Sequence, residues 1–257
     1  MLLISGSDAG QVNPFALTPV EREVLQGKQN SPVVYRYASM DELYFELRLR
    51  DRIVNASRML QDSRADFAVF RQSRCNPRYW TRTDNGGFQM NPDVRPSDAI
   101  NDIFQNGEEY GFECATAIVI VLYKGVLDTI GEQMFNSLFN PLYLRDWNHD
   151  SDLWFITTHN KNEALPGDVM YFRNPDFDRD TPEWQGENVV KLSENLFFGH
   201  GIGIESGEEI ITALNKMREP GSMESAYLDD LVVHPNFKHL QTIASRQSRF
   251  ALRLGNL

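Results

Sequence analysis

One long apolar run constrains this chain more than any other stretch. Within residues 114–127 only Thr116, Tyr123 and Lys124 bring polar groups, and Gly131 follows as a stop signal. The β-branched residues of the run favour a strand by propensity, but its length favours a buried helix. The run is too short, and Lys124 too central, for a membrane span. We therefore predict a central core helix that begins with a cysteine.

That cysteine, Cys114, has two interpretations. The unpaired N–H groups and the dipole at a helix N-terminus favour a thiolate over a thiol, and a thiolate is the nucleophile that acyl transfer needs. A free cysteine is also among the most buried residue types and commonly fills space as a small apolar side chain. Taken by itself, the apolar run favours a packing role for Cys114 over a catalytic one. Other motifs in the chain are needed to choose between the two roles.

Cysteine content and charge limit the class of protein. Cys75 and Cys114 are the only cysteines, so a disulfide framework and a CxxC zinc pair are both excluded, which suits a reducing compartment. The first ten residues lack the basic segment of a signal peptide, so we expect a protein that stays inside the cell. Thirty-six acidic and twenty-five basic residues give a net charge of −11. We therefore expect no nucleic-acid and no membrane partner, whereas basic protein surfaces suit this charge.

Helical patterns dominate the first half of the chain. Ser39 and Glu42 form a capping-box signature that opens a predicted helix over residues 40–61. The charged residues that we expect on the water-facing side of this helix are Arg48, Arg50, Asp51 and Arg52. Other helical segments are predicted at 19–26, 65–72, 98–105, 133–139 and 236–252, and a loop at 75–98.

Short aromatic and β-branched segments dominate the second half. They predict strands at 152–158, 168–172, 188–192, 195–198, 200–204, 209–214 and 227–233. Helices followed by an antiparallel sheet indicate an α+β fold. We expect one domain over residues 1–257, with 1–110 a mainly helical extension with loops and 111–257 the central helix and sheet.

Three features follow one another in a recognisable order. The cysteine heads the buried helix, LPGDVMYF (165–172) enters a strand, and FFGHGIGIESGEEII (197–211) places a histidine near a strand start. This order resembles the NlpC-type papain-like fold, with cysteine on the core helix and histidine on the sheet. The strings YGFECATAIVIVLYKGVLDTIGEQMFNSLF, LPGDVMYFRNPDF, PEWQGENVV and LFFGHGIGI resemble the Bacillus-type protein-glutamine γ-glutamyltransferases, the small spore transglutaminases, over nearly the whole chain.

The resemblance implies a catalytic set of Cys114, Glu187 and His200, with no cofactor, no metal and no calcium requirement. It implies acyl transfer from the γ-carboxamide of a protein glutamine to a lysine ε-amine, with release of ammonia. The partners would be glutamine- and lysine-bearing proteins of the spore coat. It also suggests that Trp147 and Trp184 line the passage for the substrate side chains, although core packing explains these two residues equally well.

Other residues keep simpler interpretations. Glu113 is a candidate accessory carboxylate, but an electrostatic role at the helix N-terminus explains it better. The acidic run 176–187 has calcium-loop spacing at Asp176, Asp178, Asp180 and Glu187, yet threonine stands where the sharp turn needs glycine, so we interpret it as a solvated loop. Cys75 is interpreted as an incidental thiol. The other four histidines are interpreted as surface or capping residues.

Two alternatives to a transglutaminase stay open. A papain-like cysteine hydrolase, such as a cell-wall amidase or peptidase, would share the fold and the nucleophile. A non-catalytic spore-coat scaffold would retain the fold alone.

Overall fold

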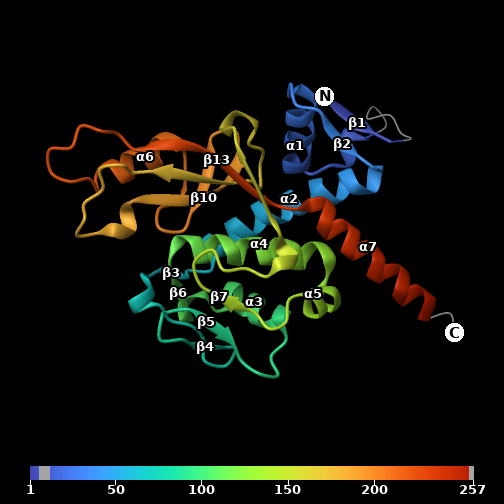
Figure 1. Ribbon diagram of the computed structural model, residues 1–257, viewed down its shortest axis with the longest axis horizontal. Coiled ribbons are helices and arrows are strands. Elements are labelled where there is room, and N and C mark those ends of the chain that lie inside the picture. The colour runs from blue at the N-terminus through green and yellow to red at the C-terminus, as the bar shows by residue number, and fades with distance from the viewer. Residues whose placement is uncertain (6–11, 255–257) are drawn as a thin grey trace.

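A six-stranded antiparallel sheet forms the upper layer of the molecule in Figure 1. The computed structural model describes residues 1–5 and 12–254, with side chains through residue 246 except Pro14. Along the sheet the strand order is β12-β11-β10-β9-β13-β8. Its strands are β8 (Phe155–His159), β9 (Val169–Arg173), β10 (Gly186–Ser193), β11 (Leu196–Gly199), β12 (Gly203–Glu205) and β13 (Tyr227–Pro235). Helices α2 and α4 lie beneath this sheet (Figure 1).

The helices and short strands surround that sheet. The helices are α1 (Pro19–Asn30), α2 (Met40–Asp62), α3 (Pro96–Gln105), α4 (Cys114–Ile130), α5 (Glu132–Leu138), α6 (Gly207–Asn215) and α7 (Phe237–Leu254). The short strands are β1 (Leu2–Ile4), β2 (Tyr35–Tyr37), β3 (Asp66–Phe67), β4 (Trp80–Arg82), β5 (Phe88–Met90), β6 (Gly111–Phe112) and β7 (Tyr143–Leu144). The 3₁₀ turns are η2 (Pro14–Ala16), η3 (Phe70–Gln72), η4 (Gly107–Glu109), η5 (Ser151–Leu153), η6 (Lys161–Glu163) and η7 (Pro182–Trp184). Among the described helices, none is both long and apolar enough to cross a bilayer.

The apolar run forms the central helix α4, as predicted. Every residue from Ala115 to Leu127 is buried, and α4 ends at Gly131, whose φ of 83° favours glycine. Helix α2 lies directly against it. At Gly125 a Cβ atom would lie 2.6 Å from the Ile53 side chain, so glycine allows the two helices to approach closely. This helix pair is buried between the six-stranded sheet and the layer formed by α3, β4 and β5, and its burial supplies the main core.

The α+β prediction is confirmed, together with most of the predicted elements. The helices predicted at 19–26, 40–61, 98–105, 133–139 and 236–252 are present with ends shifted by a few residues. Helix α2 begins at a Ser39 cap, but the Glu42 carboxylate accepts from the Ala38 N–H, so the reciprocal capping box is not formed. The predicted loop at 75–98 contains the short hairpin β4–β5.

Three local predictions are wrong. Residues 209–214 form helix α6, because Ser206 and Glu209 make a reciprocal capping box and Ile210 and Leu214 bury one helical face. The segment 65–72 pairs as β3 with β6 and then forms a 3₁₀ turn. Of the predicted strand at 200–204, only its end belongs to β12, and His200 lies in the turn after β11.

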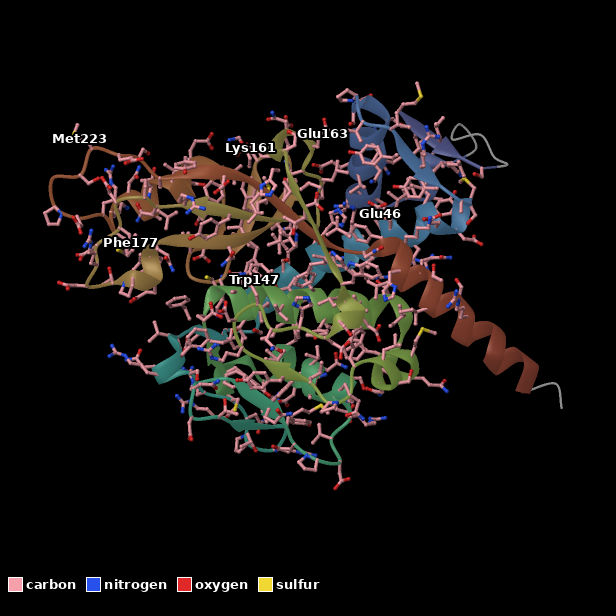
Figure 2. The ribbon with its side chains drawn as sticks, viewed as in Figure 1. Glu46, Trp147, Lys161, Glu163, Phe177 and Met223 are labelled. Atoms are coloured by element: carbon pink, nitrogen blue, oxygen red, sulfur yellow. The ribbon has the colours of Figure 1, made fainter. Side chains whose placement is uncertain are left out.

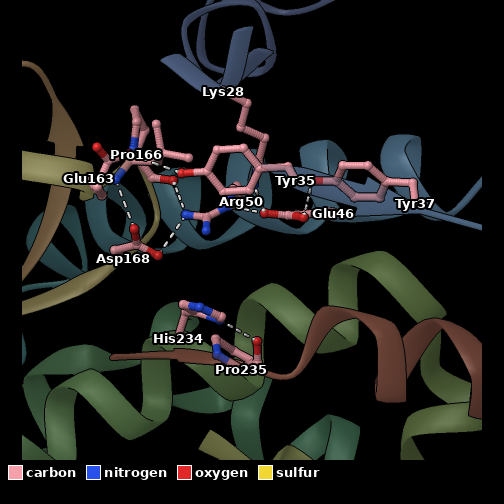
Figure 3. Close-up of polar contacts among 11 residues, drawn as sticks. Lys28, Tyr35, Tyr37, Glu46, Arg50, Glu163, Pro166, Asp168, His234 and Pro235 are labelled. Atoms are coloured by element: carbon pink, nitrogen blue, oxygen red, sulfur yellow. Dashed lines mark hydrogen bonds and ion pairs between the residues drawn. The ribbon is translucent and has the colours of Figure 1, made fainter. Parts of the chain in front are cut away.

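A further correction concerns the charged side of α2. Arg50 and Asp51 were expected to face water, yet they are only 3% and 5% exposed. The Arg50 guanidinium donates to Glu46 at 2.8 Å and to Asp168 at 2.7 Å, as Figure 3 shows. It also donates to the Pro166 carbonyl at 3.0 Å. A buried arginine persists here because its charge is paired with two carboxylates and its Nε and Nη1 donors meet acceptors.

This buried cluster joins distant parts of the chain. Lys28 of α1 lies 2.8 Å from the Glu46 carboxylate, and the Tyr37 hydroxyl donates to the same carboxylate at 2.6 Å. Burial alone would raise the pKa of Glu46, but the charges of Lys28 and Arg50 outweigh it and hold that pKa well below its usual range. The cluster therefore fastens α1 and β2 to α2, and α2 to the turn that leads into β9.

Replacing Glu46 by glutamine keeps the side-chain shape but removes the negative charge that Lys28 and Arg50 share. A buried charge left without its partner costs about 3–5 kcal/mol. We expect the free energy of unfolding, measured by urea denaturation, to fall by about that amount.

Glu108→Gln is the matched control, because the Glu108–Arg64 pair is 73% and 80% exposed at its side chains. Its loss should change the free energy of unfolding by less than about 1 kcal/mol. Similar losses in the two variants would contradict a structural role for the buried cluster.

Candidate active site

The first turn of α4 is held by the side chain that precedes it. Glu113 is the N-cap, and its two carboxylate oxygens accept hydrogen bonds from the N–H groups of Ala115 and Thr116 at 2.8 and 2.7 Å. The Thr116 hydroxyl donates to the same carboxylate at 2.6 Å. The electrostatic role expected for Glu113 is thus accompanied by direct capping. Cys114 begins the helix immediately after this cap.

The same threonine fixes a neighbouring loop. The Asp146 backbone N–H donates to the Thr116 hydroxyl at 2.8 Å, so the loop after β7 is tied to the cap of α4. Asp146 has a φ of 51°, in the left-handed region that few side chains adopt. Trp147 follows it. One buried hydroxyl therefore links this loop to the first turn of α4.

A cavity of about 830 Å³, which we call the groove, opens beside Cys114. Its lining comes from the β3–η3 segment, the start of α4, the loop after β7, the η7 segment and the strands β8, β9, β10 and β13. The groove residues are Phe67, Val69, Phe70, Glu113, Cys114, Ala115, Asp146, Trp147, Phe155, Thr157, Tyr171, Arg173, Pro182, Glu183, Gln185, Gly186, Asn188, Leu231 and Val233. Figure 2 shows Trp147 between α4 and the sheet. The groove exposes the thiol to a substrate that has an extended side chain.

Asn188 makes the direct polar contact to the sulfur. Its side-chain amide donates to Cys114 Sγ at 3.3 Å. The residue lies on β10 opposite Tyr171 of β9, which also lines the groove and donates from its hydroxyl to the Gln185 carbonyl at 3.2 Å. Asn188 was not among the site residues predicted from the sequence. The sequence feature that could have pointed to Asn188 is its position directly after Glu187, in the segment PEWQGENVV that carries the family resemblance.

The surroundings of Cys114 oppose the thiolate that a helix N-terminus favours. Burial first, and then the charges of Glu187 and Glu113, raise the pKa of the Cys114 thiol, and hydrogen bonds from Asn188 oppose this only in part. The helix N-terminus does not offset the rise because the Glu113 carboxylate already occupies its N–H groups. These surroundings favour the protonated thiol over the thiolate.

Glu187 is buried beneath the β11–β12 hairpin. It is 1% exposed, and its carboxylate accepts the Gly201 N–H at 3.1 Å. At Gly199 a Cβ atom would lie 2.8 Å from the Glu187 side chain, so glycine makes room for the carboxylate. Burial raises the pKa of Glu187 to about 8, the Gly201 hydrogen bond opposes the rise, and Glu113 adds to it. A carboxyl with this pKa can exchange a proton near neutral pH.

His200 lies in the same hairpin but serves different contacts. Its ring N–H at Nε2 donates to the Asp66 carbonyl at 3.1 Å, and its ring stacks on Phe112 with centroids 4.7 Å apart. Burial lowers the pKa of His200 to about 4, although the Asp66 carbonyl opposes the shift. Within the described part of the chain, no hydrogen bond joins Cys114 to either His200 or Glu187.

The two tryptophans take different places. Trp147 lines the groove and meets Phe155 edge to face, with ring centroids 6.1 Å apart. Trp184 is not among the groove residues, but it stacks on the groove residue Phe67 with ring centroids 5.8 Å apart. Trp147 can thus contact a substrate directly, whereas Trp184 supports an aromatic side chain that does.

The acidic loop and the second cysteine lie apart from this arrangement. Asp176 accepts from the Ser222 hydroxyl at 2.8 Å, which links this loop to the one after α6, and Asp178 accepts from the Asp180 N–H at 2.9 Å within its own loop. Over residues 1–5 and 12–254, no group of His, Cys, Asp and Glu side chains is arranged to hold a metal ion. Burial raises the pKa of Cys75 to about 11, and this residue is absent from the groove.

Known proteins of one family match most of the length of this chain. The family model for protein-glutamine gamma-glutamyltransferase matches residues 1–244. The protein-glutamine gamma-glutamyltransferase of Halalkalibacterium halodurans is 45% identical over 251 residues, covering 95% of this chain and 88% of that protein. That of Bacillus pumilus is 44% identical over 230 residues, covering 89% and 93%.

A solved structure supports the same assignment. The transglutaminase from Geobacillus stearothermophilus, without its C-terminal extension, superposes with a TM-score of 0.76 and 53% identity, covering 80% of this chain and 98% of that one. The family resemblance predicted from the four sequence strings is confirmed. The chain belongs to the protein-glutamine gamma-glutamyltransferase family and is an enzyme of that class.

Proposed function

We propose that this enzyme crosslinks proteins through a thioester on Cys114, with Glu187 as the proton carrier and His200 as a positioning residue. The observation that carries the proposal is the setting of the sulfur. It lines the groove, accepts a hydrogen bond from Asn188, and lies near enough to the Glu187 carboxylate for that charge to raise its pKa. A neutral thiol with a buried, titratable carboxyl nearby suits base-assisted attack.

The first step forms the thioester. Glu187 accepts the thiol proton as sulfur attacks the γ-carbonyl carbon of a protein glutamine, and the carbonyl electron pair moves to oxygen. N–H donors stabilise this oxyanion, and the Asn188 amide is near enough to the sulfur to be one of them. The carbonyl then re-forms, the carbon–nitrogen bond breaks, and the proton held by Glu187 passes to the departing nitrogen. Ammonia leaves, and the γ-glutamyl group stays on Cys114.

The second step consumes the thioester. A lysine ε-amine that has lost its extra proton to solvent attacks the thioester carbon, and the carbon–sulfur bond breaks. Glu187 accepts a proton from the attacking nitrogen and returns it to the sulfur. The product is an ε-(γ-glutamyl)lysine crosslink, and the thiol is restored.

The contacts of His200 support its separate role. Its pKa of about 4 keeps the ring neutral at neutral pH, and its Nε2 N–H is occupied by the Asp66 carbonyl. The histidine instead links the turn beside Glu187 to β3, which leads into the groove wall. Loss of His200 would then disturb the position of Glu187 rather than remove a proton carrier.

Aromatic walls favour transfer to an amine over hydrolysis. Phe67, Trp147 and Tyr171 line the groove around the thiol, and a dry surrounding limits attack of water on the thioester. This favours a transferase over the papain-like hydrolase and over a scaffold without activity.

The proposal extends to an NlpC-type papain-like core, one catalytic domain over residues 1–257, independence from calcium, and spore-coat substrates met inside the cell.

The dependence of ammonia release on an added primary amine tests the proposed activity. Ammonia release from a glutamine-bearing protein should rise when a primary amine is added, and multimers that resist reduction should form. Cys114→Ala should abolish both, while the matched variant Cys75→Ala should retain them. Ammonia release that does not change when amine is added would identify a hydrolase. Formation of multimers by Cys114→Ala would exclude the catalytic role of Cys114.

The pH profile separates Glu187 from His200. Because Glu187 must be ionised to accept the thiol proton, kcat/KM for ammonia release should rise with pH up to about 8. A base with the His200 pKa of about 4 would instead give a profile that is flat at neutral pH.

Variants at the two positions complete the comparison. Glu187→Gln should lower kcat/KM by about a hundredfold or more and remove the rise with pH. His200→Ala should cause a smaller loss and keep the rise. The opposite pattern would make His200 the base.

Asn188→Ala should slow thioester formation by about ten- to a hundredfold, because the sulfur loses its side-chain donor. The same loss should move alkylation of Cys114 by iodoacetamide to higher pH, followed on the Cys114 peptide by mass spectrometry. An unchanged alkylation profile would show that the amide does not stabilise the thiolate.

A further inference from the structure

The groove holds acidic side chains that the proposed chemistry does not use. Its charged residues are Glu113, Asp146, Arg173 and Glu183. Glu113 is occupied as the helix cap, and Arg173 is paired with Asp229 at 2.9 Å. In the part of the chain that the structure describes, the carboxylates of Asp146 and Glu183 have no hydrogen-bond or ion-pair partner. The groove therefore offers unpaired negative charge beside the nucleophile.

Asp146 is the better placed of the two. Its N–H is bonded to the hydroxyl of Thr116, which follows Cys114 by two residues on the same helix. Because one helical turn rises about 5.4 Å, this anchor lies within about one turn of Cys114. Glu183 belongs to η7, outside this link to the α4 cap. The structure thus couples the position of the Asp146 backbone to that of the thiol.

The surroundings of Asp146 leave its carboxylate available. The residue is exposed, and the preceding Arg145 is directed elsewhere, with its guanidinium 4.2 Å over the Phe70 ring and its Nε donating to the Asn85 carbonyl at 3.2 Å. Trp147, next in the chain, presents an aromatic side chain to the same groove. A carboxylate beside an aromatic ring suits a side chain that has an apolar stem and a cationic end.

We propose that Asp146 recognises the ammonium group of the acceptor lysine, while the lysine stem lies along Trp147. This inference rests on the proposed acyl transfer and adds the acceptor specificity of the same groove. Lysine reaches the groove as a cation and reacts as a neutral amine. An ion pair at Asp146 holds the nitrogen near the thioester before its proton is lost, so it lowers the KM for lysine without taking part in bond breaking. The glutamine side chain is neutral and gains nothing from this carboxylate.

The test compares two acceptors in the full-length enzyme with one fixed glutamine peptide. A lysine peptide is cationic, whereas hydroxylamine is a neutral nucleophile at mildly alkaline pH. Asp146→Asn preserves the shape and suits the left-handed backbone. It should raise the KM for the lysine peptide roughly three- to fivefold, as expected for loss of a partly solvated ion pair. The KM for hydroxylamine should stay unchanged, because this acceptor brings no positive charge to Asp146.

Two further variants sharpen the result. Asp146→Lys should raise the KM for lysine more than Asp146→Asn does, because attraction becomes repulsion. Added salt should raise the wild-type KM for lysine and have less effect on Asp146→Asn. Glu183→Gln is the matched control within the groove and should leave the KM for lysine nearly unchanged.

Three results would overturn the inference. They are an unchanged KM for lysine in Asp146→Asn, an equal rise for hydroxylamine, and an equal rise in Glu183→Gln. Each leaves the acyl transfer intact, because the wild-type enzyme would still release ammonia and form crosslinks. Failure of the wild-type enzyme to do either would instead remove the proposed function, and the inference with it.

Discussion

The carboxylate of Glu113 is the contact on which the site depends. It caps α4 through the N–H groups of Ala115 and Thr116, and it accepts the Thr116 hydroxyl, which in turn holds the Asp146 loop. One half-buried carboxylate therefore orders the first turn of the core helix and the loop that carries Trp147. The same charge neutralises the helix terminus that would otherwise favour a thiolate. Glu113 thus orders the backbone at Cys114 and also makes the Cys114 thiol less acidic.

This arrangement explains why the enzyme would need a nearby base. Burial and two carboxylates raise the pKa of the thiol, so an attack by this thiol would have to be coupled to proton removal. Glu187 is suited to that task because burial brings its own pKa to about 8. The acidic surroundings that disfavour the thiolate also suit a cationic acceptor. The groove would therefore combine a neutral resting nucleophile with attraction for lysine, and its aromatic walls would limit competition from water.

Sequence predicted the parts of the structure that depend on strong local patterns. The apolar run identified α4, and Ser39 marked the start of α2. The helix at 207–215 was missed because Ile210, Ile211 and Leu214 suit a strand as well, and only the Ser206–Glu209 cap distinguishes them. Burial of Arg50 depends on Asp168, which is distant in sequence, so periodicity alone could not predict it. The bond from Asn188 to sulfur likewise requires the packing of β10 on α4.

Mass spectrometry of the acyl-enzyme tests the central claim most directly. A glutamine peptide added without amine should leave an adduct on the Cys114 peptide with the mass of the donor less ammonia, and added lysine should discharge it. The adduct should form much more slowly in Glu187→Gln than in His200→Ala. Crosslinking without any adduct at Cys114, or an adduct that forms as fast in Glu187→Gln as in the wild type, would contradict the account.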